Sequence, residues 1–119
     1  MKKYLVIGNP IDHSLSPKLH NFWIKQNNID AIYNKKKLND DEIKNLILEI
    51  RENKISGINV TVPFKNKVIP FLDELSSGAK HTQSVNTIFM KDNKVIGDNT
   101  DIGGFESAIK KLNIKGLET

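Results

Sequence analysis

The stretch GINVTVPFK, residues 57–65, decides the fold, because it reads as a strand with one apolar and one polar face. The apolar face consists of Ile58, Val60 and Val62. The polar face carries Asn59 and Thr61, since side chains two residues apart share a face of a strand. A proline follows, and Lys65 comes just after it. A buried polar group without a partner costs about 1–3 kcal/mol. We therefore expect the polar face either to line a cleft or to be paired with backbone.

Outward from this stretch, strands and helices alternate along the chain. Strands are predicted over residues 4–7, 31–34, 57–62, 85–90 and 94–97, the last two forming a hairpin. Helices are predicted to begin at Ser16-Pro17, at Asn39 or Asp40, near Lys65, at Asp73 and at Thr100 or Asp101. This order predicts one α/β domain over residues 1–119, with three layers. Its sheet is mostly parallel with one antiparallel strand, and helices cover both faces.

Three of the helices carry an apolar stripe at helical spacing. The first is expected to bury Leu19, Phe22 and Trp23. The second presents Ile43, Leu46, Ile47 and Ile50, and the last presents Phe105, Ala108, Ile109 and Leu112. The stretch 73–80 is expected to be a further short helix, and the helix near Lys65 is expected to be interrupted around Pro70.

Composition argues against several function classes. There is no apolar run of about 18 residues, so no membrane partner is expected. The chain has no cysteine, and its start lacks an apolar signal core, which favours a cytoplasmic location. The net charge of +4 comes from scattered lysines without interleaved aromatics, so no nucleic-acid partner is expected. A non-catalytic surface or nucleic-acid protein remains an alternative, and it predicts salt-sensitive binding to polyanions. His13, His20 and His81 lack metal-ligand spacing, so no metal is expected.

Polar groups collect at the loop edges of the predicted sheet, where ligands of α/β proteins bind. They lie in the stretches SLSP (14–17), NVTVPFK (59–65), SVNT (84–87) and GDNTDIGGF (97–105). Each has a structural alternative: Ser16 and Asp101 suit helix caps, Asn86 suits a turn, and Lys65 suits a solvated surface. Taken together, they predict a site for a small polyhydroxylated acid.

Four ordered motifs resemble shikimate dehydrogenases. They are IGNPIDHSLSPKLHN (7–21), GINVTVPFK (57–65), SVNTI (84–88) and GDNTDIGGF (97–105), within a resemblance that covers residues 4 to about 112. The resemblance implies the N-terminal, substrate-binding domain of an NADP-dependent enzyme. That enzyme reduces 3-dehydroshikimate to shikimate on the route to chorismate and the aromatic amino acids.

The resemblance also implies a role for each site residue. Ser14 and Ser16 hold the substrate carboxylate, with Thr61 nearby. Asn59, Asn86 and Asp101 bind the ring hydroxyls. Lys65 and Asp101 form the catalytic pair and need no metal. An ammonium beside the reacting carbonyl stabilises the charge growing on oxygen and supplies the proton.

The family continues into a Rossmann-type domain with a glycine-rich NADP loop, whereas this sequence stops at Thr119. The resemblance therefore implies that the NADP site lies in a C-terminal domain absent from this chain, which is expected not to turn over alone. Two alternatives stay open. One is a quinate/shikimate dehydrogenase, and the other is a free-standing, non-catalytic binding module for shikimate-like acids.

Overall fold

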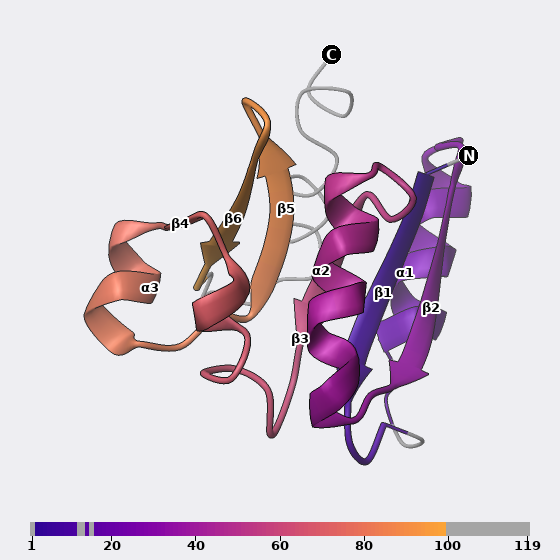
Figure 1. The fold of residues 1–119 in the computed structure, drawn as a ribbon. Coiled ribbons are helices and arrows are strands. Elements are labelled where there is room, and N and C mark those ends of the chain that lie inside the picture. Colours follow the sequence, from indigo (N-terminus) through magenta and orange to yellow (C-terminus); the bar gives the residue numbers. More distant parts are fainter. Residues whose placement is uncertain (1, 12–13, 15, 100–119) are drawn as a thin grey trace.

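The computed structural model describes residues 2–11, 14 and 16–99, and these build a six-stranded sheet (Figure 1). The strands are β1 (Lys2–Gly8), β2 (Ala31–Lys37), β3 (Gly57–Val60), β4 (Glu74–Leu75), β5 (Thr87–Lys91) and β6 (Lys94–Asp98). Their order across the sheet is β2-β1-β3-β5-β6-β4. Strand β5 runs antiparallel to β3 and β6, while the other neighbours pair in parallel. The predicted α/β sheet with one antiparallel strand is confirmed.

Helices α1 (Ser16–Gln26) and α2 (Ile43–Arg51) lie on opposite faces of this sheet (Figure 1). A short helix, α3 (Ser77–Thr82), and two 3₁₀ turns, Asp40–Glu42 and Ile69–Phe71, complete the described elements. The predicted three-layer arrangement is thus confirmed. Within the described residues, no helix combines the length and the apolar character that crossing a membrane requires. The helix predicted from Thr100 or Asp101 onward lies outside the described residues.

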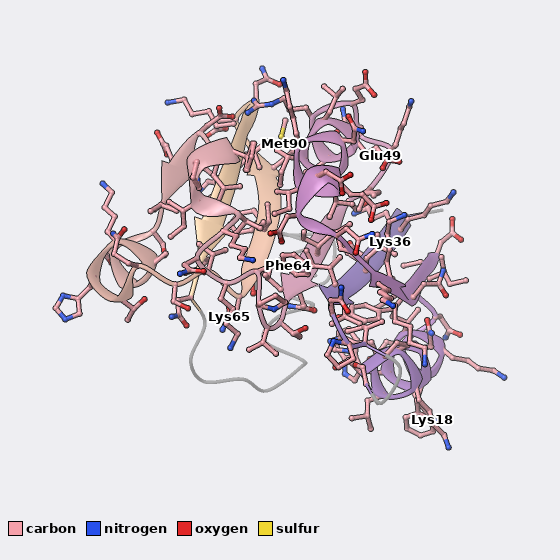
Figure 2. The ribbon with its side chains drawn as sticks, turned by 60° about the horizontal axis from the view of Figure 1, so that its bottom comes forward. Lys18, Lys36, Glu49, Phe64, Lys65 and Met90 are labelled. Atoms are coloured by element: carbon pink, nitrogen blue, oxygen red, sulfur yellow. The ribbon has the colours of Figure 1, made fainter. Side chains whose placement is uncertain are left out.

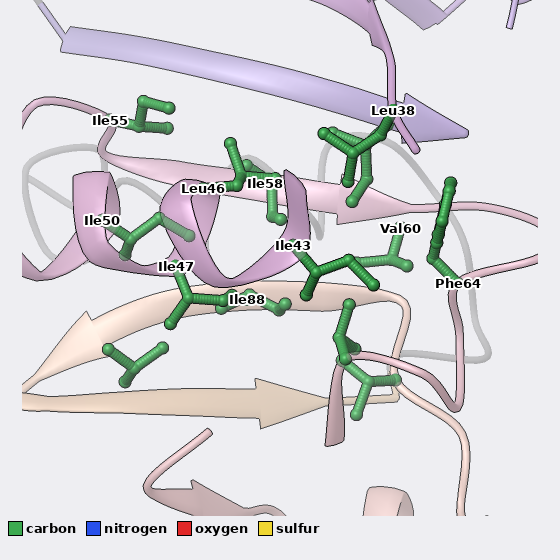
Figure 3. Close-up of a cluster of buried hydrophobic side chains, with 14 of the residues drawn as sticks. Leu38, Ile43, Leu46, Ile47, Ile50, Ile55, Ile58, Val60, Phe64 and Ile88 are labelled. Carbon is green, nitrogen blue, oxygen red and sulfur yellow. The ribbon is translucent and has the colours of Figure 1, made fainter. Parts of the chain in front are cut away.

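The main core lies between α2 and the sheet (Figure 3). All four residues of the predicted stripe of α2, Ile43, Leu46, Ile47 and Ile50, are buried there. They pack with Ile58 and Val60 of β3 and with Ile88 of β5. The helix is preceded by Asn39, whose backbone N–H donates to the Glu42 carboxylate at 2.9 Å, as in a capping box. Local pattern and tertiary packing agree in this part of the chain.

The buried face of α1 differs in part from the predicted one: Trp23 packs partly buried against a core cluster, whereas the other two residues of the predicted stripe do not. Leu19 and Phe22 are 50% and 64% exposed, whereas His20 and Ile24 are buried against the sheet. The reason is a polar anchor next to His20. The Asn21 side chain donates to the Tyr33 carbonyl at 2.6 Å and accepts from the Tyr33 N–H at 2.8 Å. These bonds to edge strand β2 turn the helix toward its His20 side, so the apolar spacing does not select the face.

The polar-faced strand is shorter than predicted. It ends at Val60 instead of Val62, and Val62 is 65% exposed instead of buried. Beyond Val60 the chain leaves the sheet, because the N–H of Phe64 bonds to the carbonyl of Thr61 in a tight turn. The two-residue alternation therefore stops applying at that point. Val60 itself is buried and Asn59 faces the opposite side, as predicted.

The segment after Lys65 forms turns and the 3₁₀ turn Ile69–Phe71, not the predicted helix. The helix predicted over 73–80 begins only at Ser77, and Glu74–Leu75 forms edge strand β4 instead. Backbone bonds from Asp73 to Val95 and from Ser76 to Gly97 draw the segment onto the side of β6. The Ser76 hydroxyl then accepts from the Ala79 N–H at 3.2 Å and caps α3.

Candidate functional site

A pocket of about 280 Å³ lies where β1 and β3 end. It is lined by Pro10, Ile11, Ser14, Thr61 and Val62. The two strands pair in parallel, so their carboxyl ends meet at one edge of the sheet, and the loops that follow them face each other. Two predicted site residues from distant parts of the chain, Ser14 and Thr61, therefore share one hollow.

The Thr61 hydroxyl has its proton committed to the backbone. It donates to the carbonyl oxygen of Ile7 at 2.7 Å, and the Thr61 N–H bonds to the same oxygen at 2.9 Å. A hydroxyl offers one donor and two acceptor sites. Toward a ligand Thr61 can therefore accept a hydrogen bond, which suits a ligand hydroxyl and does not suit a carboxylate.

Gly8 is a site residue that the sequence analysis missed. A Cβ atom at this position would collide with Thr61 Oγ1 and come within 3.3 Å of the Val62 carbonyl oxygen. Only glycine thus lets Thr61 approach β1 closely enough to reach Ile7. The sequence signal was a glycine at the end of a strand, and its meaning became visible only when the neighbouring strand was paired.

Ser14 has the opposite polarity to Thr61. Its hydroxyl oxygen accepts from the backbone N–H of Ser16 at 3.3 Å, which leaves the hydroxyl hydrogen for another acceptor. Helix α1 begins at Ser16, so Ser16 is the first helical residue and not the predicted N-cap. Ser14 thus stands at the positive end of a helix with a donor to offer, which suits an anionic group.

Asn59 lies on the α1 face of the sheet, at the inner end of a buried polar array. Its Oδ1 accepts from the Tyr33 hydroxyl at 2.5 Å, and its Nδ2 lies 3.5 Å from the Asn86 carbonyl oxygen. The His20 ring stacks on Tyr33 with centroids 4.0 Å apart, and His20 Nδ1 lies 2.8 Å from the Ser16 carbonyl oxygen. The array therefore runs from the start of α1 to β3.

Burial shifts the protonation of this array. It raises the pKa of the Tyr33 hydroxyl well above its ordinary range, so Tyr33 stays a donor. It also lowers the pKa of the His20 imidazole, and the contact with the Ser16 carbonyl opposes this shift only in part. Both groups are therefore held neutral near pH 7.

Asn86 connects the ends of β3 and β6. Its carbonyl accepts from the Val60 N–H at 2.8 Å, and its own N–H donates to the Asp98 carbonyl at 2.9 Å. Its side chain accepts from the Thr87 hydroxyl at 3.0 Å and donates to Asn99 Oδ1 at 3.2 Å. Thr87 is fully buried and pairs with Asn59 across the strands. Asn86 was predicted from the sequence as a site residue, whereas Thr87 was not.

Lys65 is exposed and follows the buried Phe64, and the two residues lie close together in Figure 2. Its carbonyl accepts from the Val85 N–H at 2.7 Å, which fixes its backbone beside the residue that precedes Asn86. Asp101 lies outside the described residues, so the catalytic pair stays a prediction. The structure joins Ser14 with Ser16 and Thr61, and separately joins Asn59 with Asn86.

Metal-binding and phosphate-binding groups have recognisable side-chain and backbone requirements. In residues 2–11, 14 and 16–99, no three histidine or acidic side chains gather in a way that could hold a metal ion. In the same part of the chain, no glycine has the left-handed conformation on which glycine-rich phosphate loops draw. The pocket beside Ser14 and Thr61 has the size for a small ligand.

Comparison with known proteins relates this site to one family. The family model described as shikimate dehydrogenase substrate binding domain matches residues 6–88. A protein of Pelagibacter ubique named shikimate dehydrogenase (NADP(+)) is 62% identical over 116 residues, which are 96% of this chain and 44% of that protein. A protein of the same name from Clostridium perfringens is 42% identical over 118 residues. The chain thus spans about 44% of the length of these curated relatives.

Solved structures agree with this relationship. The shikimate dehydrogenase of Aquifex aeolicus matches with a TM-score of 0.80 and 40% identity, over 94% of this chain and 42% of that one. The shikimate 5-dehydrogenase of Thermus thermophilus, in complex with NADP(H) and shikimate, matches with a TM-score of 0.80 and 31% identity. That match covers 96% of this chain and 43% of that one.

Proposed function

Because the chain belongs to the shikimate dehydrogenase substrate-binding domain family, we propose that residues 1–119 bind shikimate and 3-dehydroshikimate as one domain of an NADP-dependent shikimate dehydrogenase. The observation that carries this proposal is the pocket shared by Ser14 and Thr61. One hydroxyl there has a proton to donate, and the other has only lone pairs to offer. A ligand that carries both a carboxylate and hydroxyl groups matches this pair.

The proposed contacts follow from the polarity of each group. Ser14 and Ser16 bind the carboxylate, where the start of α1 adds favourable partial charge. Thr61 accepts from a ligand hydroxyl. Asn59 and Asn86, together with Asp101, bind the remaining hydroxyls through amide and carboxylate groups. The same contacts suit quinate as well as shikimate, so the preference between the two acids has to be measured by titration with each.

For the reaction, we propose that Lys65 holds the proton at its Nζ. In the reductive direction this proton passes to the carbonyl oxygen of 3-dehydroshikimate as that oxygen becomes a hydroxyl. In the oxidative direction the neutral amine takes the proton back. Asp101 orients Lys65 by charge and hydrogen bonding. NADPH, when bound, supplies the hydride.

The chain spans about 44% of the length of its NADP(+)-named relatives, so we propose that another part of the full-length enzyme holds NADP. On this proposal, the 119-residue chain binds the acid and shows no turnover with NADP alone. Turnover at a normal rate by this chain would contradict it. Binding without turnover in the native protein, with no cofactor domain attached, would instead favour a free-standing binding module.

The test is a titration of the ¹⁵N-labelled chain with shikimate, followed by NMR, with quinate in a parallel series. We expect shifts at Ser14, Asn59, Thr61 and Asn86. Ser14→Ala is expected to weaken shikimate binding about tenfold or more, since a hydrogen bond to a charged group is lost. Ser77→Ala, at the exposed start of α3, is the matched control and should bind normally. Absence of shifts at these residues at high ligand concentration would refute the proposal.

A further inference from the structure

We propose that Tyr33 is a positioning residue, which fixes the orientation of the Asn59 amide so that Asn59 meets its ligand as a hydrogen-bond donor. This inference rests on the proposed function, because it assigns a partner to one of the proposed ligand-binding residues. Tyr33 belongs to edge strand β2 and is not one of the site residues predicted from the sequence.

The first step is the contact between the two side chains. The Tyr33 hydroxyl lies 2.5 Å from Asn59 Oδ1, and the tyrosine is fully buried. Because burial keeps the tyrosine protonated, its hydroxyl donates the hydrogen bond and Asn59 Oδ1 accepts it. The nitrogen of the Asn59 amide is thereby turned to the other side.

The contacts of Asn59 Nδ2, on the side of the amide away from Tyr33, favour the same orientation. Asn59 Nδ2 faces the Asn86 carbonyl oxygen and Thr87 Oγ1, each at 3.5 Å. A flipped amide would set Oδ1 against the Asn86 carbonyl, placing two acceptors face to face. Both contacts are at the long limit of a hydrogen bond, so Nδ2 can also donate to a ligand. The Asn86 group that it faces is the backbone carbonyl, whereas the side-chain amide of Asn86 is the other proposed hydroxyl-binding group. Both sides of Asn59 therefore favour the same orientation.

The third step is that Tyr33 is itself held from several directions. Its ring stacks on His20 with planes 6° apart, and its backbone is bonded on both sides by the Asn21 side chain. His20 in turn contacts the Ser16 carbonyl at 2.8 Å, at the start of α1. A group fixed in this way positions a neighbouring ligand-binding residue more sharply than a solvent-exposed partner would. The array thus ties Asn59 to the helix end that carries Ser14 and Ser16.

The test is Tyr33→Phe, which removes the hydroxyl and keeps the ring. Without ligand, we expect the Asn59 side-chain amide signals to move in NMR spectra, while backbone signals away from β2 and β3 stay in place. Shikimate affinity is expected to fall about three- to tenfold. Tyr4→Phe is the matched control, since Tyr4 is a buried tyrosine that lies opposite Tyr33 on β1. It should leave shikimate affinity unchanged.

A double-mutant cycle separates positioning from general stability. If Tyr33 acts through Asn59, Tyr33→Phe should add nothing to the affinity loss of Asn59→Ala, and the double variant should bind like Asn59→Ala alone. Full additivity, or normal shikimate affinity in Tyr33→Phe, would overturn the inference while the proposed function stands. If the unsubstituted chain fails to bind shikimate, the proposed function fails, and this inference fails with it.

Discussion

The hydroxyl of Thr61 donates to the carbonyl oxygen of Ile7 at 2.7 Å, so the first residue beyond β3 is tied to the last part of β1. The bond closes the edge of the sheet at the proposed site and decides the polarity of one wall of the pocket. It is possible because Gly8, which follows Ile7, has no side chain.

Gly8→Ala should damage both stability and ligand binding. The new methyl group would collide with Thr61 Oγ1 and crowd the Val62 carbonyl, so the loop after β3 must move. We expect a loss of about 1–3 kcal/mol in the free energy of unfolding, measured with urea, and weaker shikimate binding. Gly78→Ala in α3 is the control, because its Cβ would meet only the Asn99 carbonyl at an ordinary 3.4 Å. Equal stability of the two variants would contradict the crowding argument.

Lys65→Met should remove the proposed proton donor without unfolding the domain, because the lysine side chain is exposed. In a full-length NADP-dependent enzyme that carries this domain, we expect kcat to fall about 10²- to 10⁴-fold, with a smaller change in KM for shikimate. Lys67→Met is the matched control, since Lys67 pairs with Asp40 at 3.0 Å on the surface. A loss of kcat of similar size in both variants would count against a catalytic Lys65.

His20 should make stability depend on pH on the acid side of neutrality. Burial lowers its pKa in the folded chain, so the unfolded chain binds the proton more readily. Stability is therefore highest above the ordinary histidine pKa of about 6.5 and falls as the pH drops below it. The free energy of unfolding, measured with urea at about pH 7.5, 6.5 and 5.5, should fall as the pH is lowered. It should flatten in His20→Phe, which keeps an aromatic ring against Tyr33.

The control for that series is His81→Gln, which removes an exposed imidazole from α3. It should keep the dependence of the unfolding free energy on pH. If His20→Phe keeps the same dependence as the unsubstituted chain, the buried imidazole is not its source.

The ion pair between Arg51 and Asp73 should stabilise the end of α2 against β4. The guanidinium donates to both carboxylate oxygens, at 2.6 and 2.9 Å, and together with the Val95 N–H it lowers the pKa of Asp73. A carboxyl group whose pKa is lowered by folding stabilises the folded chain at pH values above its ordinary pKa. This added stability is lost as the pH falls. Asp73→Asn should cost about 0.5–1 kcal/mol at neutral pH, because the pair is partly exposed.

That difference between Asp73→Asn and the unsubstituted chain should shrink below about pH 4, as measured by urea unfolding. Glu74→Gln is the control, since it breaks the exposed single-point pair with Lys94 at 2.9 Å and should cost less. A difference that stays constant down to the lowest pH would rule out the charge of Asp73 as its cause.

Several parts of the fold could be predicted because the deciding forces act locally. The capping box of the 3₁₀ turn before α2 and the apolar stripe of α2 lie within one short segment. The β5–β6 hairpin has its turn residues between its two strands. Asn59 and Val60 face opposite sides because alternation in a strand is a local rule. The polar stretches of the site were predicted from their place at the loop edges of the sheet, whereas the role of each residue came from the resemblance.

Other parts could not be predicted, because contacts between distant segments decided them. Leu19 and Phe22 have core-like spacing, yet two bonds from Asn21 to Tyr33 turn α1 away from them. Strand β4 exists because β6 offers it a pairing edge. Neither fact is encoded in the residues nearby.

The amino-acid sequence by itself determined the alternation of strands and helices, the burial of α2 and the family to which the chain belongs, since each rests on short-range patterns or ordered motifs. Only the tertiary structure decided the polarity of the site. Whether Thr61, Ser14 or Asn59 donates or accepts depends on which backbone or hydroxyl partner takes its proton or lone pair. For Thr61 and Asn59 that partner comes from another strand. For Ser14 the partner is the nearby Ser16 N–H, and the polarity matters for a ligand because the fold places Ser14 at the pocket.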